Sequence, residues 1–371
     1  MQGRKCGMQN AECGIARKPS SRFRILHSAF RIFTFAWLAV LAPQLTACSR
    51  EGSSPDAFLV AVVVPGSTAD QGWNYSAKEG AELIQRELGL VEPVSFIENV
   101  ESSQRKSVLR SYGRKGYDLV FCHGYEFHQV VKEVVDEFPE TRFVVSGYDQ
   151  PDERFGSIVY QLGEAAYLCG VIAAHATESG HVGFIAAQRV PPVVLCHDGF
   201  RKGFLDTKPD GEVRDPQYIE GANPWEDSAA AKVRTQAMLR NREPAPIDVL
   251  FQNADAASRG IFVAVEEHPQ RIFVFGANRD QNDTSATSKV LASAVIRVDD
   301  AFLRVARAVR NGTFEVKVHS ETLATGGIDC VLSPRLADLV GDEKATAIIE
   351  RVAAAKDGII RGAIEPYDHV D

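Results

Sequence analysis

The stretch Phe58-Leu-Val-Ala-Val-Val-Val64, followed by Pro65-Gly66, decides the fold. An unbroken apolar run that ends at a turn signal predicts a strand buried on both faces, as the strands of parallel sheets are. The next segment, residues 76–88, repeats apolar side chains at the spacing of a helix. A buried strand followed by an amphipathic helix is the beginning of a βαβ unit.

The same alternation continues along the chain on both sides of its middle. Strand-like runs lie at residues 94–97, 118–122, 142–146, 157–160, 181–186, 217–219, 248–251, 271–275 and 291–298. Helix-like segments lie at residues 102–114, 127–137, 164–177, 198–204, 226–239, 257–267, 299–310 and 344–355. Two βαβ-rich halves of about 100 residues each predict an α/β fold with two Rossmann-like lobes built on parallel sheets.

The first 47 residues differ from this body. Residues 1–31 carry seven basic side chains and one acid, Glu12, and an uncharged apolar run, Ile32–Leu41, follows. A basic segment, a short apolar segment and small residues before a cleavage point are typical of a secretory signal, and the run is too short to span a membrane. We therefore expect residues 1–47 to be a signal peptide; the alternative is a buried N-terminal helix.

The signal ends in Leu45-Thr-Ala-Cys48, which resembles the bacterial lipobox. The resemblance implies cleavage before Cys48 and attachment of lipid to its thiol, and acyl chains there would hold a soluble domain at a bilayer. Residues 48–56 are polar and rich in Gly, Ser and Pro, which predicts a flexible tether. We expect an exported protein on the periplasmic or extracellular face of a membrane. Which bacterial membrane holds it, and where translation starts, stay open.

Charge and cysteine content exclude several classes of protein. The chain has 371 residues and a net charge of −8, and without residues 1–47 the net charge is −14. An acidic chain without clustered Lys and Arg is not a duplex-binding protein. The seven cysteines are too scattered for a disulfide framework or a CxxC metal site. Whether any of four cysteines pair stays open: Cys122, Cys169, Cys196 and Cys330.

Motifs for catalysis are missing from the sequence. It contains no GxGxxG after a strand and no GxxxxGK[ST], GxSxG or HExxH motif. His123 and His128 lie close in sequence but lack a carboxylate or cysteine at ligand spacing, so a structural role is favoured over a metal site. We expect a protein that is not an enzyme and that uses no cofactor or metal.

The loops after the strands combine aromatic residues with Asn and Asp. Ligands of doubly wound folds lie outside the carboxyl ends of the strands, where such side chains would suit a flat molecule with a polar edge. The alternative for Trp73 and Trp225 is simple packing on loops. The candidate ligand-binding residues are Asp70, Trp73, Asn74, Tyr125, Tyr148, Asp149, Trp225, Asn253, Asp255, Asn278 and Asp280.

From Phe58 to about Val331 the chain resembles the basic membrane protein (Bmp/PnrA-like) family of solute-binding lipoproteins. The segments that carry the resemblance are Asp70-Gln-Gly-Trp-Asn-Tyr-Ser76 with Glu79-Gly80, Ala165-Ala-Tyr-Leu-Cys-Gly-Val-Ile-Ala-Ala174, Ser179-Gly-His-Val-Gly-Phe184, Gly199-Phe-Arg-Lys-Gly203 and Gly276-Ala-Asn-Arg-Asp-Gln281. The resemblance implies the type I periplasmic binding fold, with two lobes joined by a hinge. The lobes would be residues 57–158 plus about 296–325, and residues 159–295 plus about 326–371.

The resemblance also implies a function. Proteins of this family serve ABC importers, and a purine nucleoside is the usual ligand, with aromatic residues on the base and acids and a Lys on its edge and ribose. Here Asn278 replaces an acid on the ribose, Ile296 stands at the Lys position and Gly147 at that of another acid, with Asp149 nearby. A free nucleobase or another flat heterocycle therefore joins the candidate ligands.

We expect a lipid-anchored solute-binding protein that closes its hinge over a purine nucleoside or nucleobase-like ligand. Its partners would be that small molecule, the permease subunits of an ABC importer and the membrane that holds its lipid, but not nucleic acid. Two alternatives remain: a ligand-sensing lipoprotein that signals to a membrane receptor, and a binder of another small polar solute. An exported hydrolase would need a nucleophile–base pair, which the motifs do not supply.

Overall fold

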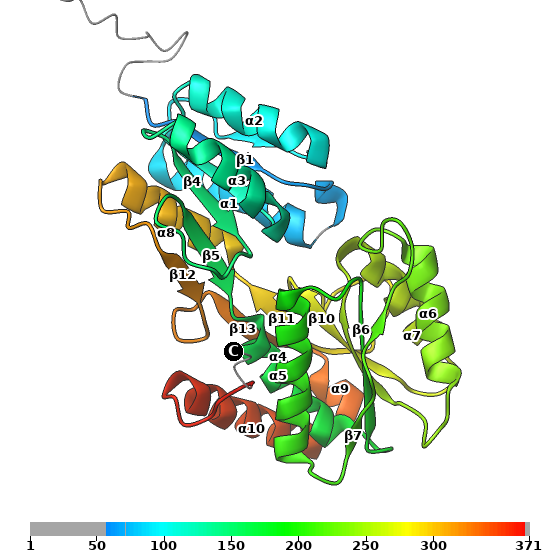
Figure 1. The fold of residues 1–371 in the computed structure, drawn as a ribbon. Helices are drawn as coiled ribbons and strands as arrows, with labels where there is room; N and C mark the ends of the chain where they lie inside the picture. The colour runs from blue at the N-terminus through cyan, green and yellow to red at the C-terminus, as the bar shows by residue number, and fades with distance from the viewer. Residues whose placement is uncertain (1–56, 71, 368–371) are drawn as a thin grey trace, which may run out of the picture. The chain divides into compact units, whose positions relative to one another are not determined.

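Two sheets organise the chain, as Figure 1 shows. The computed structural model describes residues 57–70 and 72–367. Within this part, no helix is both long and apolar enough to cross a bilayer. The predicted signal peptide, residues 1–47, and the predicted tether, residues 48–56 with Cys48, lie outside the described residues.

The first sheet has the strand order β12-β5-β4-β3-β1-β2, and its pairings are parallel. Its strands are β1 (Val60–Val63), β2 (Ser95–Ile97), β3 (Leu119–His123), β4 (Arg142–Ser146), β5 (Gly156–Tyr160) and β12 (Val318–Glu321). Its helices are α1 (Trp73–Leu88), α2 (Ser102–Arg114), α3 (His128–Val134) and α8 (Val298–Arg310), with the short 3-10 helices η1 (Thr68–Asp70), η2 (Tyr125–Phe127) and η3 (Val135–Glu137).

The apolar run that opens the chain's folded part is β1. Its side chains alternate between the two faces of the sheet: Val60 and Val62 join the core under α1 and α8, and Ala61 and Val63 join the core under α2 and α3. Helices therefore cover both faces, which explains why the strand is apolar at every position.

The second sheet has the order β13-β11-β10-β9-β6-β7, with β8 also paired to β6. Its strands are β6 (His181–Ala186), β7 (Glu212–Val213), β8 (Gln217–Tyr218), β9 (Val249–Asn253), β10 (Phe273–Asn278), β11 (Val290–Ile296) and β13 (Ile328–Leu332). Its helices are α4 (Leu162–Ala176), α5 (Pro191–Thr207), α6 (Ser228–Arg240), α7 (Ser258–Glu267), α9 (Leu336–Val340) and α10 (Asp342–Ile360), with η4 (Asp255–Ala257). Figure 1 shows α4 and α5 on one face and α6 and α7 on the other.

Glycines let α4 and α5 approach backbone to backbone. A Cβ atom on Gly199 would lie 2.1 Å from the carbonyl oxygen of Gly163, and one on Gly203 would lie 2.0 Å from that of Tyr167. Real side chains do not tolerate such distances, so larger residues there would force the helices apart. Two of the segments that carry the family resemblance thus serve helix packing.

The described chain passes between the sheets after β5, after β11 and after β12. The last passage explains why β13 runs antiparallel to β11 in a sheet that we expected to be parallel throughout. Residues 322–327 bring the chain from the end of β12 directly to the carboxyl edge of the second sheet. A strand that enters there without a crossover helix runs backwards.

Helix α5 is longer than the sequence pattern predicts. We expected a helix from Asp198 to Phe204, but α5 begins at Pro191. Pro191 and Pro192 occupy its first turn, where a missing N–H costs nothing and a fixed φ angle suits a helix. The expected strands and helices otherwise occur within a few residues of their predicted ends.

Candidate functional site

Side chains from both sheets meet where the strands end. The loop after β1 leads through η1 into α1, and the loop after β9 leads through η4 into α7. The two 3-10 helices are in contact. A Cβ atom on Gly72, which precedes α1, would lie only 3.1 Å from Oδ1 of Asp255 in η4. These segments define the candidate site.

Asp70 organises the beginning of α1. Its Oδ1 atom accepts hydrogen bonds from the backbone N–H groups of Gly72, at 3.0 Å, and Tyr75, at 3.1 Å. Its Oδ2 atom accepts from the backbone N–H and the Nδ2 atom of Asn74, both at 2.8 Å. The carboxylate thus satisfies donors that a helix N-terminus leaves free, and its charge suits the positive end of the helix dipole.

The bond to Asp70 also fixes the amide of Asn74. An ionised carboxylate only accepts hydrogen bonds, so Nδ2 must face Asp70 and Oδ1 must point the other way. Asn74 Oδ1 is buried and has no hydrogen-bond partner among the described residues. A buried acceptor is costly when unpaired, and such an atom is ready for a donor from a ligand.

Trp73 lies on a support built from His123. The two rings stack with their centroids 3.9 Å apart and an angle of 20° between their planes. Tyr160 meets the indole edge-on at 5.8 Å, and the indole also lies beside Gly147, the residue after β4. The indole itself remains half-buried. It therefore offers part of a flat apolar surface while its position is fixed from below.

His123 is held by two hydrogen bonds in the interior of the first sheet. Its Nε2 atom lies 3.0 Å from the carbonyl oxygen of Trp73, and its Nδ1 atom lies 2.6 Å from Oγ of Ser146. Because a carbonyl only accepts, Nε2 carries the hydrogen and Nδ1 accepts from the hydroxyl. Burial lowers the pKa of His123 to about 3, so the ring is neutral at physiological pH.

Asp255 is the acid that the second sheet presents to this cluster. Its φ of 46° and that of Asn278, 68°, place both residues in the left-handed region, which Asn and Asp tolerate best. Asn278 Nδ2 donates to Asp255 Oδ1 at 2.7 Å. Burial raises the pKa of Asp255 to about 7 and the charge of Asp70 adds to this, whereas hydrogen bonds from Asn278 and the backbone N–H of Trp73 lower it in part.

A second link between the sheets involves Arg279, directly after β10. Its guanidinium lies 3.2 Å from Oε1 of Glu79 and 4.4 Å above the ring of Tyr75. Both partners belong to α1. Burial raises the pKa of Glu79, and the positive charge of Arg279 opposes that shift. Arg279 therefore ties the second sheet to the helix that carries Trp73 and Asn74.

Comparison with known proteins decides the family. The model of the family described as "ABC transporter substrate-binding protein PnrA-like" matches residues 57–358. The chain belongs to this family. The "ABC transporter nucleoside-binding protein BmpA" of Lactococcus lactis subsp. cremoris is 26% identical over 313 residues, which are 80% of this chain and 84% of that protein.

A second relative and a solved structure are also similar to this chain. A "Purine-binding protein" of Brucella abortus is 25% identical over 258 residues, covering 69% of this chain and 70% of that protein. Among solved structures, an ABC transporter solute-binding protein from Aeropyrum pernix superposes with a TM-score of 0.69 at 21% identity, covering 82% of this chain and 92% of that one. The fold is that of type I periplasmic binding proteins, as the sequence predicts.

The remaining candidate residues of this substrate-binding protein lie in different surroundings. Tyr148 is buried against α3, where its ring stacks on His128 at 4.7 Å and its hydroxyl accepts from Lys132 at 2.9 Å. Tyr125, whose ring lies 6.0 Å from that of Tyr148, is exposed, as is Asp149. This group therefore lies on the α3 side of the first sheet.

The remaining candidates on the second sheet also have different surroundings. The carbonyl oxygen of Trp225 accepts from the N–H of Ala257 at 2.9 Å, which places that loop beside η4. Asn253 is buried at the end of β9, and its side chain hydrogen-bonds Cys196. Asp280 is exposed and accepts from the N–H of Asn282.

The structure adds four residues that the sequence did not single out for binding: Tyr75, Glu79, His123 and Arg279. His123 was noted only as a histidine without metal partners. Glu79 and Arg279 both lie in segments that carry the family resemblance, which was the available signal. Their mutual contact spans 200 positions of the chain and has no local pattern.

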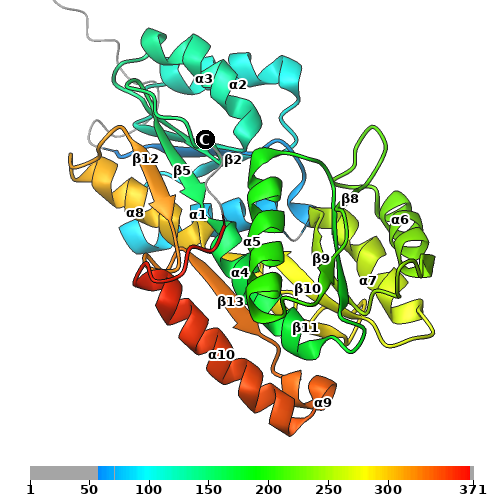
Figure 2. The same cartoon turned by 60° about the horizontal axis from the view of Figure 1, so that its bottom comes forward.

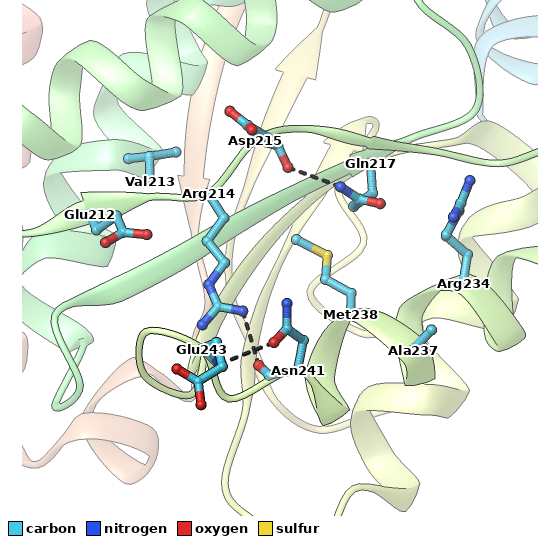
Figure 3. Close-up of a pocket in the computed structure, with 10 residues that line it drawn as sticks. All are labelled: Glu212, Val213, Arg214, Asp215, Gln217, Arg234, Ala237, Met238, Asn241 and Glu243. Atoms are coloured by element: carbon cyan, nitrogen blue, oxygen red, sulfur yellow. Dashed lines mark hydrogen bonds between the residues drawn. The ribbon is translucent and has the colours of Figure 1, made fainter.

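A pocket of about 440 Å³ lies away from this cluster, at the edge of the second sheet (Figure 3). It is lined by residues of β7, the segment after it and the end of α6, and β7 pairs with the first residues of β6, far from the carboxyl ends of the strands. The guanidinium of Arg214, which lines the pocket, donates hydrogen bonds to the backbone carbonyls of Asn241 and Ala245. None of the candidate ligand-binding residues lines this pocket.

Proposed function

We propose that the protein is a lipid-anchored, extracytoplasmic solute-binding protein of an ABC importer whose ligand is a purine nucleoside or a nucleobase-like molecule. The observation that carries the proposal is the meeting of three features: the supported indole of Trp73, the unpaired acceptor of Asn74 and the carboxyl of Asp255. An indole surface suits a flat base, and the two oxygens suit N–H groups on its edge.

The names of the Lactococcus lactis and Brucella abortus relatives agree with this chemistry, since one is described as nucleoside-binding and the other as purine-binding. The departures at Asn278 and Ile296 concern the expected ribose contacts. Asn278 is engaged with Asp255, and Ile296 is buried at the end of β11. We therefore include nucleobases beside nucleosides.

Ligand uptake would proceed by closure of the two proposed lobes, residues 57–158 plus about 296–325 and residues 159–295 plus about 326–371. Contacts from both sheets to one ligand stabilise the closed state, and no bond of the ligand changes. The lipid on Cys48 would keep the protein beside the permease that receives the ligand.

The experiment that tests the proposal is identification of the retained ligand. Gently purified protein is denatured, the released small molecules are weighed by mass spectrometry, and calorimetry then compares adenine, guanine, adenosine, guanosine, glucose and an amino acid. We expect a purine in the released fraction and micromolar or tighter binding of at least one purine. Binding of glucose or the amino acid alone would overturn the purine assignment and leave the family intact.

A further inference from the structure

Two cysteine side chains that are not among the candidate ligand-binding residues are in contact. Sγ of Cys169, on α4, lies 3.8 Å from Sγ of Cys330, on β13, although 161 positions separate them in the chain. Both are thiols in the structure. A disulfide needs the two sulfurs about 2.05 Å apart, so the pair must approach further by side-chain rotation.

The elements that carry the two thiols are held against each other by other contacts. Glu164, in the first turn of α4, accepts a hydrogen bond from the N–H of Leu323 at 2.6 Å. Asp329, beside Cys330, pairs with Lys356 of α10 at 2.7 Å, and α10 packs on α4. Figure 2 shows α10 running alongside β13. These contacts hold α4 and β13 together and so keep the two sulfurs close to each other.

The two thiols differ in accessibility. Cys169 is fully buried, whereas Cys330 keeps part of its surface exposed. Burial raises the pKa of Cys169, which makes that thiol a poor first nucleophile. Cys330 is thus the thiol that an external oxidant meets first, and Cys169 is the one placed to resolve the product.

We propose that Cys169 and Cys330 form a disulfide by exchange with a small or protein disulfide. The Cys330 thiolate attacks one sulfur of the external disulfide, which releases one thiol and leaves a mixed disulfide on Cys330. Cys169 then loses its proton and attacks the Cys330 sulfur, which releases the second thiol. The two electrons lost by the pair reduce the external disulfide.

This disulfide would join two segments of the second sheet's half, each of which directly follows a place where the chain crosses over from the first sheet. Helix α4 follows the passage after β5, and β13 follows the passage after β12. Closing so long a loop restricts the unfolded chain, so the oxidised protein should be more resistant to unfolding. Neither cysteine is among the residues that meet around Trp73 and Asp255, so ligand affinity should not depend on the link.

The test oxidises the full chain with oxidised glutathione and maps non-reduced tryptic peptides by mass spectrometry. The peptides 155–189 and 318–335 contain Cys169 and Cys330, and the peptides 190–201 and 116–132 contain Cys196 and Cys122. We expect the first two to be linked, with Tm raised by roughly 5–10 °C over the reduced protein. The variant Cys330→Ser should lose both effects, and Cys122→Ala, the matched buried control, should keep them.

Three outcomes would overturn the inference: no linked peptide, a link to Cys196 instead, or glutathione remaining on Cys330 without transfer to Cys169. None of them bears on the solute, because the assay contains no ligand. A second arm isolates the protein from the cell surface with thiols blocked at lysis. It rests on the proposed export, since only an oxidising compartment would form the link in the cell. Linked peptides there support the inference, and reduced peptides in exported protein would contradict it for the cell.

Discussion

The two halves of the candidate site are built by different means. On the first sheet, Asp70, Trp73 and Asn74 lie at the start of one helix. The carboxylate of Asp70 accepts hydrogen bonds from the backbone of that helix start and from Asn74, and His123 stacks on Trp73 and holds its ring in place. On the second sheet, Asp255 and Asn278 have left-handed backbone conformations. Burial and the charge of Asp70 raise the pKa of Asp255 to about 7. The first half supplies a rigid shape and the second supplies a group whose charge can change.

The two halves also differ in their effect on the free energy of unfolding. The first half stabilises its own helix, because its polar groups satisfy backbone donors. The second half carries backbone conformations and a buried acid that lower stability and that a ligand can compensate. Removing a group from the first half should therefore weaken the fold, and removing the acid from the second should strengthen it at neutral pH.

The largest expected effect on stability comes from Asp70→Ala. The change removes four hydrogen bonds at the start of α1, and we expect unfolding to become easier by about 2–3 kcal/mol, measured by urea denaturation. Asp149→Ala, which removes an exposed acid of the same sheet, should change stability by less than about 0.5 kcal/mol. Equal losses in the two variants would show that the hydrogen bonds of Asp70 do not stabilise the start of α1.

Asp255→Asn should act in the opposite direction and with pH. The pKa of Asp255 rises from an ordinary 3.8 to about 7 on folding, so between these values the folded state binds more protons than the unfolded state. Stability of the wild type therefore falls as pH rises from 4 to 7, and the variant lacks this contribution. The shift alone corresponds to about 4 kcal/mol at pH 8. Because the amide of the variant accepts the hydrogen bonds from Asn278 and Trp73 less strongly than the carboxylate does, we expect the variant to be more stable by on the order of 2 kcal/mol at pH 8 and equally stable near pH 4.

Denaturation of both proteins at pH 4, 6 and 8 measures this difference. An unchanged or lower stability of the variant at pH 8 would show that Asp255 is not an energetic burden on the free protein.

The smallest effect is expected for Arg279→Ala, which breaks the link between the halves. The ion pair with Glu79 is partly exposed, so its loss should weaken ligand affinity only about twofold to fivefold, and high salt should reduce the difference. Arg154→Ala breaks ion pairs to Asp136 and Asp152, which all belong to the first sheet, and serves as the matched control. A similar loss in both variants would mean that Arg279 acts through general charge and not as a link.

Much of the fold could be predicted from the sequence, because a buried strand and an amphipathic helix each show a characteristic spacing of apolar residues within a short segment. The run at residues 58–64 and the apolar α4 are examples. Strands β12 and β13 were not predicted, and the direction of β13 depends on the edge at which the chain enters the second sheet. The beginning of α5 was missed because Pro191-Pro192 is compatible with either a turn or a first helical turn.

The site was predictable only in part, for a similar reason. Asp70, Trp73 and Asn74 follow β1 in one segment, so the pattern reveals them together. His123 lies under Trp73 only because β3 neighbours β1 in the sheet. Tyr148 follows β4 as the predicted loop residues do, yet its side chain lies on the α3 face, since neighbouring residues point to opposite sides of a strand end.

The binding of a base on Trp73 is tested by a calorimetric titration of the best purine ligand into the wild type, Trp73→Leu and Phe314→Leu. Phe314 packs on Gly156, away from the site, and controls for loss of an aromatic ring. Stacking on an aromatic ring is worth about 1–3 kcal/mol per base, so Trp73→Leu should weaken binding roughly tenfold to a hundredfold while Phe314→Leu leaves it unchanged. Wild-type affinity in a folded Trp73→Leu protein would contradict the account.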